Sequence, residues 1–320
     1  MKINNINKWV AVMGAGNSSN DSTIGSAVFV IDLENGGKLL KTIDINDKTT
    51  NSIANFVPSD VALVTANTTS NAKFTGAMAY VVDVEGKITK INLTDQGSLF
   101  SQTQLFDSEY LPDTTLGSSK NNRKNFTGLE TAIIDGQLWL FFGTGDLEKI
   151  QIRDDNIHKN RLFGIKDEAS LNNIIFQTTS SKTAANCTNA GNIGTCPGIN
   201  NIGWYYDLPN SQRLTDRPTF SNNYLYFSTY EPPSGFACTW GNASLLVRDA
   251  KCGQQSKLYL LGTGVANQAT VAGNKVIVSL SGKTAASSAG QTKINDNLIV
   301  IDQVGTSQSQ EPLIEAWREN

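Results

Sequence analysis

The segment Asp135-Gly136-Gln137-Leu138-Trp139-Leu140-Phe141-Phe142-Gly143-Thr144-Gly145 carries the pattern that decides the fold. It begins with a two-residue turn of the kind that tolerates the positive φ angles of a tight hairpin. An apolar run of strand length follows, and a Gly-x-Gly sequence ends it. Together these features predict a β-strand that begins after a hairpin turn and ends at a glycine turn.

The same features recur along the whole chain. Gly-x-Gly also follows a strand-like run at 14–16 and at 262–264. Further apolar, β-branched and aromatic runs of strand length lie at Trp9–Met13, Ala27–Leu33, Ala77–Val84, Tyr224–Ser228, Lys257–Leu261, Val276–Leu280 and Leu298–Asp302. No long segment has the period of a helix, so the sequence predicts an all-β fold.

The spacing of the tight turns indicates the architecture. Two-residue turn signals occur at Asn35-Gly36, Glu85-Gly86, Asp135-Gly136, Asn222-Asn223 and Gly273-Asn274, and their first residues are 50, 50, 87 and 51 positions apart. A period near 50 is the size of one four-stranded propeller blade. We therefore expect residues 1–320 to form one β-propeller domain of the quinoprotein-dehydrogenase-like kind, partial or modified. The step of 87 is either two blades or one blade with a loop insertion at about 172–201.

Composition and charge exclude several classes of protein. Hydrophobic residues make up 39% of the 320 residues, which is enough for a real core and excludes global disorder. The 26 basic residues against 29 acidic ones leave a net charge of -3, so nucleic acid is not an expected partner. No apolar run reaches the length of about 18 residues that a membrane span needs. Residues 1–7 do not resemble a signal peptide, so an export signal is expected upstream.

Four cysteines occur in the chain, at Cys187, Cys196, Cys238 and Cys252. They form two sequence-local pairs with 8 and 13 intervening residues, and neither pair has the C-x-x-C spacing of zinc or thioredoxin-type sites. Two short-loop disulfides are therefore favoured over reduced thiols. Disulfides indicate an oxidising compartment outside the cytoplasm.

The candidate catalytic and metal motifs are weak. His158 is the single histidine and lies in a polar stretch, so multi-histidine metal sites are excluded and a Ser-His-Asp triad would depend on one residue. Gly282-Lys283-Thr284 resembles the end of a phosphate-binding loop, but Ile277 stands where the first glycine is required. The stretches 44–50 and 60–71 both lack the carboxylates of a calcium loop, the second offering only Asp60. We expect a protein that is not an enzyme.

Two alternative functions remain for a propeller of this blade size. One is a quinone-dependent dehydrogenase, which needs carboxylates at the ring centre. Its candidates are Asp32, Asp83 and Asp146. The other is a carbohydrate-binding, lectin-like propeller with aromatic stacking platforms. Its candidates are Trp139, Trp204 and Trp240. Aspartates that cap turns and tryptophans that pack in the core explain these residues more simply.

Seven segments, in one order along the chain, carry a resemblance to a known family. They are Lys8–Asn17, Ala27–Gly36, Tyr80–Ile88, Leu140–Gly145, Arg161–Ile165, Gly203–Leu208 and Ala316–Glu319. The ordered set resembles the C-terminal propeller domain of the PilC/PilY family, the large tip-associated adhesins and assembly factors of bacterial type IV pili. The segment around Cys238, with Lys257–Leu261 after it, is also similar to the family's late cysteine and the strand that follows. Because Cys252 lies between them, a local disulfide is expected there.

The resemblance implies a function and a location. It implies a non-enzymatic propeller module that supports pilus assembly and extension and mediates adhesion to surfaces or host cells. The implied partners are minor pilins or other pilus-tip proteins. The implied location is extracellular or on the cell surface, at the pilus tip and associated with the outer membrane.

The chain departs from the family pattern in two places. Members typically carry an Asp-rich calcium loop before the strand that corresponds to Ala79–Val84, whereas this chain has a Thr, Ser and Asn-rich stretch there. Calcium is the cofactor that the family suggests, but its loop is degenerate here and no ligand set is carried over. The family's propeller also begins well upstream of Lys8, so this chain is expected to be the C-terminal part of a longer protein. Because blades bury their faces only against neighbours, we predict a missing blade from the parent protein or from a partner chain.

Overall fold

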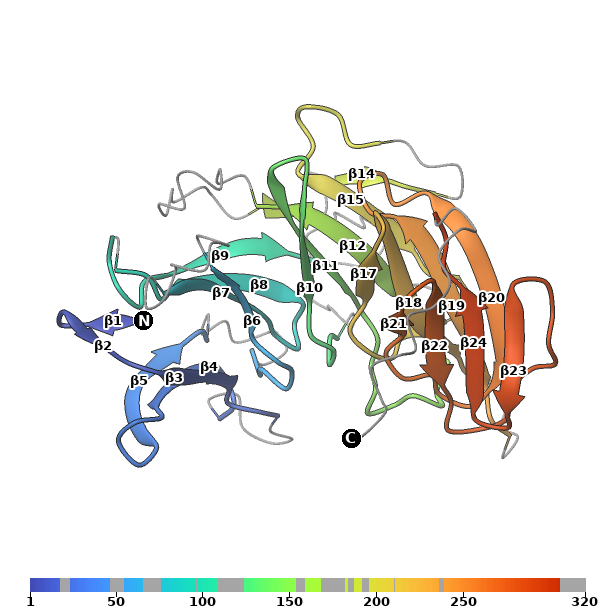
Figure 1. Ribbon diagram of the computed structural model, residues 1–320, viewed down its shortest axis with the longest axis horizontal. Coiled ribbons are helices and arrows are strands. Elements are labelled where there is room, and N and C mark those ends of the chain that lie inside the picture. Colours follow the sequence, from blue (N-terminus) through green and yellow to red (C-terminus); the bar gives the residue numbers. More distant parts are fainter. Residues whose placement is uncertain are drawn as a thin grey trace, which may run out of the picture.

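The computed structural model builds all its described regular elements from β-strands (Figure 1). It describes residues 1–17, 24–46, 55–65, 76–95, 97–108, 124–153, 159–167, 182–183, 187–191, 196–209, 211–235 and 239–305. His158, Cys238 and the segment Ala316–Glu319 therefore lie outside the described residues.

Five sheets follow one another in chain order, and we call them the first to fifth blades. After a short hairpin of β1 (Lys2–Ile3) and β2 (Ile6–Asn7), the first blade consists of β3 (Val10–Gly14), β4 (Ala27–Asp32) and β5 (Lys38–Asp44). The second blade consists of β6 (Ala62–Thr65), β7 (Ala77–Val82), β8 (Lys87–Asn92) and β9 (Gln102–Asp107), with β13 (Lys182–Thr183) at its edge.

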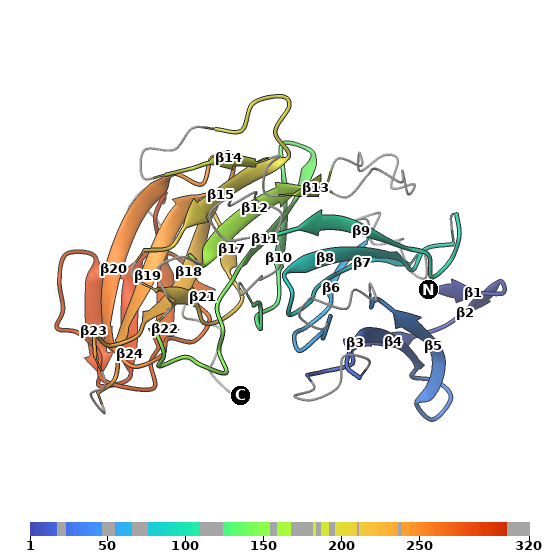
Figure 2. The ribbon, with the colours of Figure 1, turned by 180° about the vertical axis from the view of Figure 1, so that it is seen from behind.

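The other three blades complete the described array (Figures 1 and 2). The third consists of β10 (Glu130–Ile134), β11 (Gln137–Gly143), β12 (Arg161–Lys166), β15 (Gly203–Asp207) and β14 (Cys187–Asn189). The fourth consists of β16 (Arg213–Leu214), β17 (Thr219–Ser221), β18 (Tyr224–Glu231), β19 (Asn242–Asp249) and β20 (Gln255–Thr263). The fifth consists of β21 (Thr270–Ala272), β22 (Lys275–Ser279), β24 (Leu298–Asp302) and β23 (Gln291–Asn295).

The tight turns of the sequence are hairpin turns in the structure, although they do not all occupy equivalent positions. Asp135-Gly136 and Asn222-Asn223 have positive φ angles and join the first two strands of the third and fourth blades. Glu85-Gly86 instead joins β7 to β8, the second and third strands of their blade. The step of 87 residues corresponds to one blade with an insertion, because β12 pairs directly with β15 and the described residues between them form only the edge strands β13 and β14.

Alternating side chains of each strand pack against different neighbours. In β7, Met78 and Tyr80 lie in the core between the second and third blades, whereas Ala79 and Val81 lie in the core between the first and second. Both faces of this strand are therefore buried, as expected for a sheet stacked between two others. Aromatic rings fill the interface with the third blade: Phe142 stacks on Phe163 with 4.8 Å between ring centroids.

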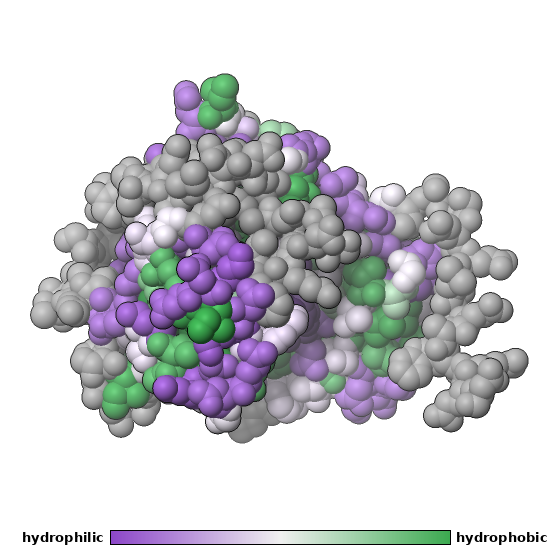
Figure 3. Space-filling view, turned by 60° about the vertical axis from the view of Figure 1, so that its left-hand side comes forward, coloured by the Kyte–Doolittle hydropathy of each residue, from purple (hydrophilic) through white to green (hydrophobic). Residues whose placement is uncertain are grey.

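The two terminal blades each have one face without a neighbouring sheet in the described part of the chain. In β4, Val28 and Val30 are fully buried, but Phe29 and Ile31 on the other face are only half-buried. Register pairs Met13 with Phe29 and Leu39 with Ile31, and both partners are about half exposed. Figure 3, which brings this side of the molecule forward, shows hydrophobic side chains among hydrophilic ones. The missing blade stays a prediction, and this bare face is where one would pack.

Within the described ranges, no helix that could span a membrane is found.

Candidate functional site

We call β6, β10, β17 and β21 the first strands of their blades, and the four lie side by side. In the fourth blade this is β17, because the two-residue β16 before it pairs with the same strand, β18. β10 contacts β6 and β17, and β17 in turn contacts β21. The residues that precede these strands therefore meet, and they line a cavity of about 240 Å³, which we call the axial pocket. Its lining includes Ser59, Asp60, Phe126, Thr127, Arg217 and Gln268.

The position of Gly128 shows how closely three of these loops approach one another. A Cβ atom on Gly128 would lie 3.6 Å from Arg217 Cδ and 3.8 Å from both Ser59 Cβ and the Asp60 carbonyl oxygen. These are ordinary van der Waals distances. The loops before β6, β10 and β17 are thus in direct contact, so the pocket is built by three blades at once.

Asp216 ties the fourth blade to the fifth beside the pocket. Its Oδ2 accepts a 2.9 Å hydrogen bond from the backbone N–H of Gln268, and its Oδ1 accepts one of 2.8 Å from the N–H of Arg217. Thr215 Oγ1 adds a 2.7 Å bond to the carbonyl oxygen of Ala266. Both carboxylate oxygens of Asp216 are therefore engaged in holding the loop that presents Arg217.

Arg217 is the cation of the pocket, and acidic groups flank it on two sides. Its Nε lies 3.7 Å from Glu130 Oε2, and its Nη1 lies 4.0 Å from Asp60 Oδ2. Burial raises the pKa of Glu130, although the Arg217 charge opposes this shift. The side chain of Asp60 is 88% exposed, so its charge lies at the solvent-facing rim of the pocket.

Three buried polar atoms, each on a residue that lines the pocket, have no hydrogen-bond partner. They are Ser59 Oγ, Thr127 Oγ1 and Arg217 Nε. Thr127 as a whole is only 7% exposed. Buried polar groups in folded proteins are nearly always paired, with protein groups or with water. The residues that line the pocket therefore carry unpaired hydrogen-bonding groups, both donors and acceptors, in its walls.

The structure corrects the expected cysteine pairing. Cys196 and Cys252 form a disulfide across 56 residues, so the sequence-local pairing of Cys187 with Cys196 and of Cys238 with Cys252 is wrong. Cys187 is a thiol in the core between the second and third blades, and burial raises its pKa to about 12. Cys238 lies outside the described residues.

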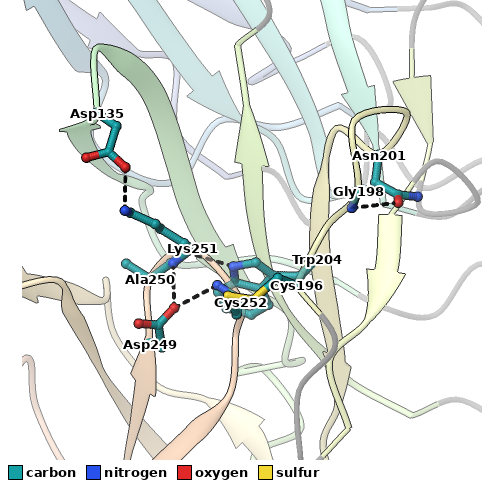
Figure 4. Close-up of a disulfide and its surroundings, with 9 residues drawn as sticks. All are labelled: Asp135, Cys196, Gly198, Asn201, Trp204, Asp249, Ala250, Lys251 and Cys252. Carbon is teal, nitrogen blue, oxygen red and sulfur yellow. Dashed lines mark hydrogen bonds and ion pairs between the residues drawn. A yellow bond between two sulfur atoms is a disulfide. The ribbon is translucent and has the colours of Figure 1, made fainter.

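The interface between the third and fourth blades explains this pairing (Figure 4). Trp204 on β15 donates a 2.8 Å hydrogen bond from its indole nitrogen to the carbonyl oxygen of Ala250, in the turn after β19. In the same turn, Asp249 Oδ1 accepts hydrogen bonds from the backbone N–H groups of Lys251 and Cys252. The turn that carries Cys252 is thereby fixed against β15, and the disulfide with Cys196 joins the insertion to it.

The three carboxylates named for a dehydrogenase are engaged within their own blades. Asp32 pairs with Lys8 at 2.5 Å, and Asp146 lies 3.4 Å from Lys124. Asp83 accepts hydrogen bonds from the backbone N–H of Lys87 and from the side-chain amide of Asn55. None of the three lines the axial pocket.

Two of the three tryptophans named as sugar platforms are core residues. Trp139 is 4% exposed and Trp204 is fully buried, both in the cluster between the third and fourth blades. Trp240 is 56% exposed. Stacking on a ligand is thus excluded for the first two and remains open only for Trp240.

The structure describes the two calcium stretches at 44–46 and 60–65, and the rest of each lies outside the described residues. Asp44 Oδ1 accepts a hydrogen bond from the backbone N–H of Asn46, which makes an ordinary turn. Asp60 is the one carboxylate of its stretch that the structure brings to a pocket. Within the described ranges, no group of three or more His, Cys, Asp or Glu side chains could hold a metal ion.

Sequence reasoning missed most of the axial pocket. It singled out Asp60 but not Thr127, Asp216 or Arg217, which lie two to three residues before the first strands of their blades. That position is itself the available signal. In a propeller the first strands surround the axis, so residues just before them meet there, once the blade boundaries are known.

Comparisons with known proteins support the fold. No protein-family model matches the chain, and no curated protein matches it either. Among solved structures, the C-terminal domain of PilY1 from Pseudomonas aeruginosa aligns with a TM-score of 0.57 and 16% identity over 93% of this chain. An α-L-arabinofuranosidase from Clostridium thermocellum aligns with a TM-score of 0.33 and 12% identity over 84% of this chain and 81% of its own.

The PilY1 likeness covers part of that protein's domain. The chain spans 64% of the length of the PilY1 domain. At 16% identity the match shows a shared fold, so the chain is an all-β protein built of propeller blades with a PilY1-like arrangement.

Proposed function

We propose that this chain is a non-enzymatic propeller module of a type IV pilus tip-associated protein. The observation that carries the proposal is the PilY1-like fold over 93% of the chain, together with the ordered family segments of the sequence. The module supports pilus assembly and extension, and adhesion to surfaces or host cells, by binding minor pilins or other tip proteins.

Two features of the molecule support a binding role at the cell surface. The disulfide between Cys196 and Cys252 suits an oxidising, extracytoplasmic location. In the axial pocket, the carboxylate of Asp216 accepts two backbone hydrogen bonds. Glu130, which is not among the lining residues, lies 3.7 Å from Arg217 Nε. These contacts favour a structural role for both carboxylates over proton transfer.

The test is a direct binding experiment. The purified, oxidised chain is immobilised, and the soluble domains of the minor pilins encoded in the same genome are passed over it, singly and mixed. We expect saturable binding to at least one pilin or pilin mixture, and none to an unrelated β-propeller of similar size. A folded chain that binds no minor pilin in any combination would contradict the proposal.

A further inference from the structure

The axial pocket brings three unpaired polar groups to one small cavity. Ser59 precedes the second blade's first strand, Thr127 the third blade's and Arg217 the fourth blade's, and each carries a buried atom without a hydrogen-bond partner. Seven other such atoms are scattered over the described residues, whereas these three belong to residues that line one cavity. Convergence from three blades on one cavity indicates a site built for a polar occupant.

The charges of the pocket disfavour an ionic occupant. The guanidinium of Arg217 is offset by Asp60 and Glu130, at 4.0 Å and 3.7 Å. Asp60 and Asp216 both line the pocket, so an anion would meet two carboxylates for one cation there. A metal ion would find Asp216 already bonded to two backbone N–H groups, with Arg217 adjacent. The occupant is therefore neutral, and it must both donate and accept hydrogen bonds.

The size and walls of the pocket narrow the choice further. At about 240 Å³ the cavity is smaller than sites for drug-sized ligands, which start near about 300 Å³. It corresponds to about eight water molecules at about 30 Å³ each, enough for one small ring. Phe126 and Leu147 add apolar surface to the lining.

We propose that the axial pocket binds a single neutral sugar ring. Adjacent hydroxyls of a sugar satisfy the pocket as a set: one accepts a hydrogen bond from the guanidinium of Arg217, and its neighbour donates to the carboxylate of Asp60. Other hydroxyls pair with Ser59 and Thr127, and the C–H groups of the ring pack against Phe126. This site is independent of pilin binding, so either proposal can fail without the other.

The test uses ligand-observed saturation-transfer NMR on the oxidised chain. The probes are methyl glycosides of the neutral pentoses and hexoses at millimolar concentration, with a chelator present. We expect saturation to reach the ring protons of at least one glycoside. Asp60→Asn and Thr127→Val should each weaken that binding at least tenfold, whereas the control Thr292→Val, on the exposed side of β23, should not change it.

Three results would overturn the proposal. They are the absence of saturation transfer to every glycoside, equal binding by wild type and both pocket variants, and occupancy of the pocket by calcium or by inorganic phosphate instead of a sugar. Both variants should unfold at a midpoint equal to or above that of wild type. A loss of binding then reflects a lost ligand contact and not a damaged fold. Asp60 is 88% exposed, so its substitution leaves the fold intact.

Discussion

Trp204 and Ala250 are joined by a 2.8 Å hydrogen bond that crosses from the third blade to the fourth, from indole nitrogen to backbone carbonyl. The indole is fully buried and lies edge-on to Phe227 of the fourth blade, with 6.4 Å between ring centroids. A buried polar group that is paired in this way holds its neighbours in a single arrangement. The same turn carries Cys252, so the hydrogen bond and the disulfide fasten one interface.

Removal of the disulfide should destabilise the chain substantially. In the chain-entropy model, a crosslink that closes a 56-residue loop contributes about 4 kcal/mol. We therefore predict that the double variant Cys196→Ala, Cys252→Ala loses about 4 kcal/mol in free energy of unfolding, measured by urea denaturation. Non-reducing peptide mapping should find Cys196 linked to Cys252, and a peptide that links Cys187 to Cys196 would contradict the structure.

A methyl group on Gly164 should damage the same interface. Gly164 pairs with Trp204 across β12 and β15, and a Cβ there would lie 2.5 Å from the indole nitrogen. We predict that Gly164→Ala costs about 1–3 kcal/mol, because the ring cannot move within a packed core. Gly128→Ala is the matched control, since its Cβ would meet atoms no closer than 3.6 Å. Equal stability of the two variants would contradict this.

The sequence predicts the parts of this architecture that depend on local contacts, but not the parts that depend on contacts between blades. Hairpin turns such as Asp135-Gly136 are local, so they are visible in the sequence and they identify blades correctly. The pairing of Cys196 with Cys252 depends on how two blades stack, and sequence distance favoured the wrong partner, Cys187. The axial pocket is harder still, because Ser59, Thr127 and Arg217 belong to three blades and share no motif.

The Asp83 carboxyl should make the chain less stable as the pH rises from about 4 to about 7. Burial raises the pKa of Asp83 from 3.8 to about 7, with a smaller contribution from Glu85, while Lys87 and Asn55 oppose the shift. In that pH range the folded chain holds a proton on Asp83 that the unfolded chain has lost. This group therefore lowers the free energy of unfolding by up to about 1.4 kcal/mol for each pH unit.

The check is urea denaturation of wild type and of Asp83→Asn at pH 5 and pH 7.5. The variant cannot ionise at position 83, so its free energy of unfolding should depend less on pH between these values. Asp302→Asn serves as the control because that carboxylate is exposed, and it should keep the wild-type slope. The same slope in all three proteins would argue that Asp83 is ionised throughout.

The bare face of the first blade should bind hydrophobic dyes. Met13 and Leu39 are 49% and 51% exposed on that face, where an inner propeller sheet would be covered. We predict that Met13→Gln with Leu39→Gln lowers dye fluorescence and self-association while changing stability by less than about 0.5 kcal/mol. The single variant Leu260→Gln, at a 65% exposed position on β20, should have a weaker effect. Unchanged dye binding in the double variant would mean that this face is already covered.

Two buried threonines should respond in opposite ways to the same substitution. Thr127 Oγ1 has no partner, so Thr127→Val removes an unsatisfied hydroxyl and should leave the free energy of unfolding unchanged or raise it by up to about 1 kcal/mol. Thr144 Oγ1 accepts a 2.8 Å hydrogen bond from the backbone N–H of Arg161. Thr144→Val leaves that buried N–H group without an acceptor and should lower the free energy of unfolding by about 1–3 kcal/mol. Thermal and urea unfolding of both variants measure the difference. A large loss in Thr127→Val would show that its hydroxyl is bonded within the protein, which would remove it from the set of groups that await a ligand.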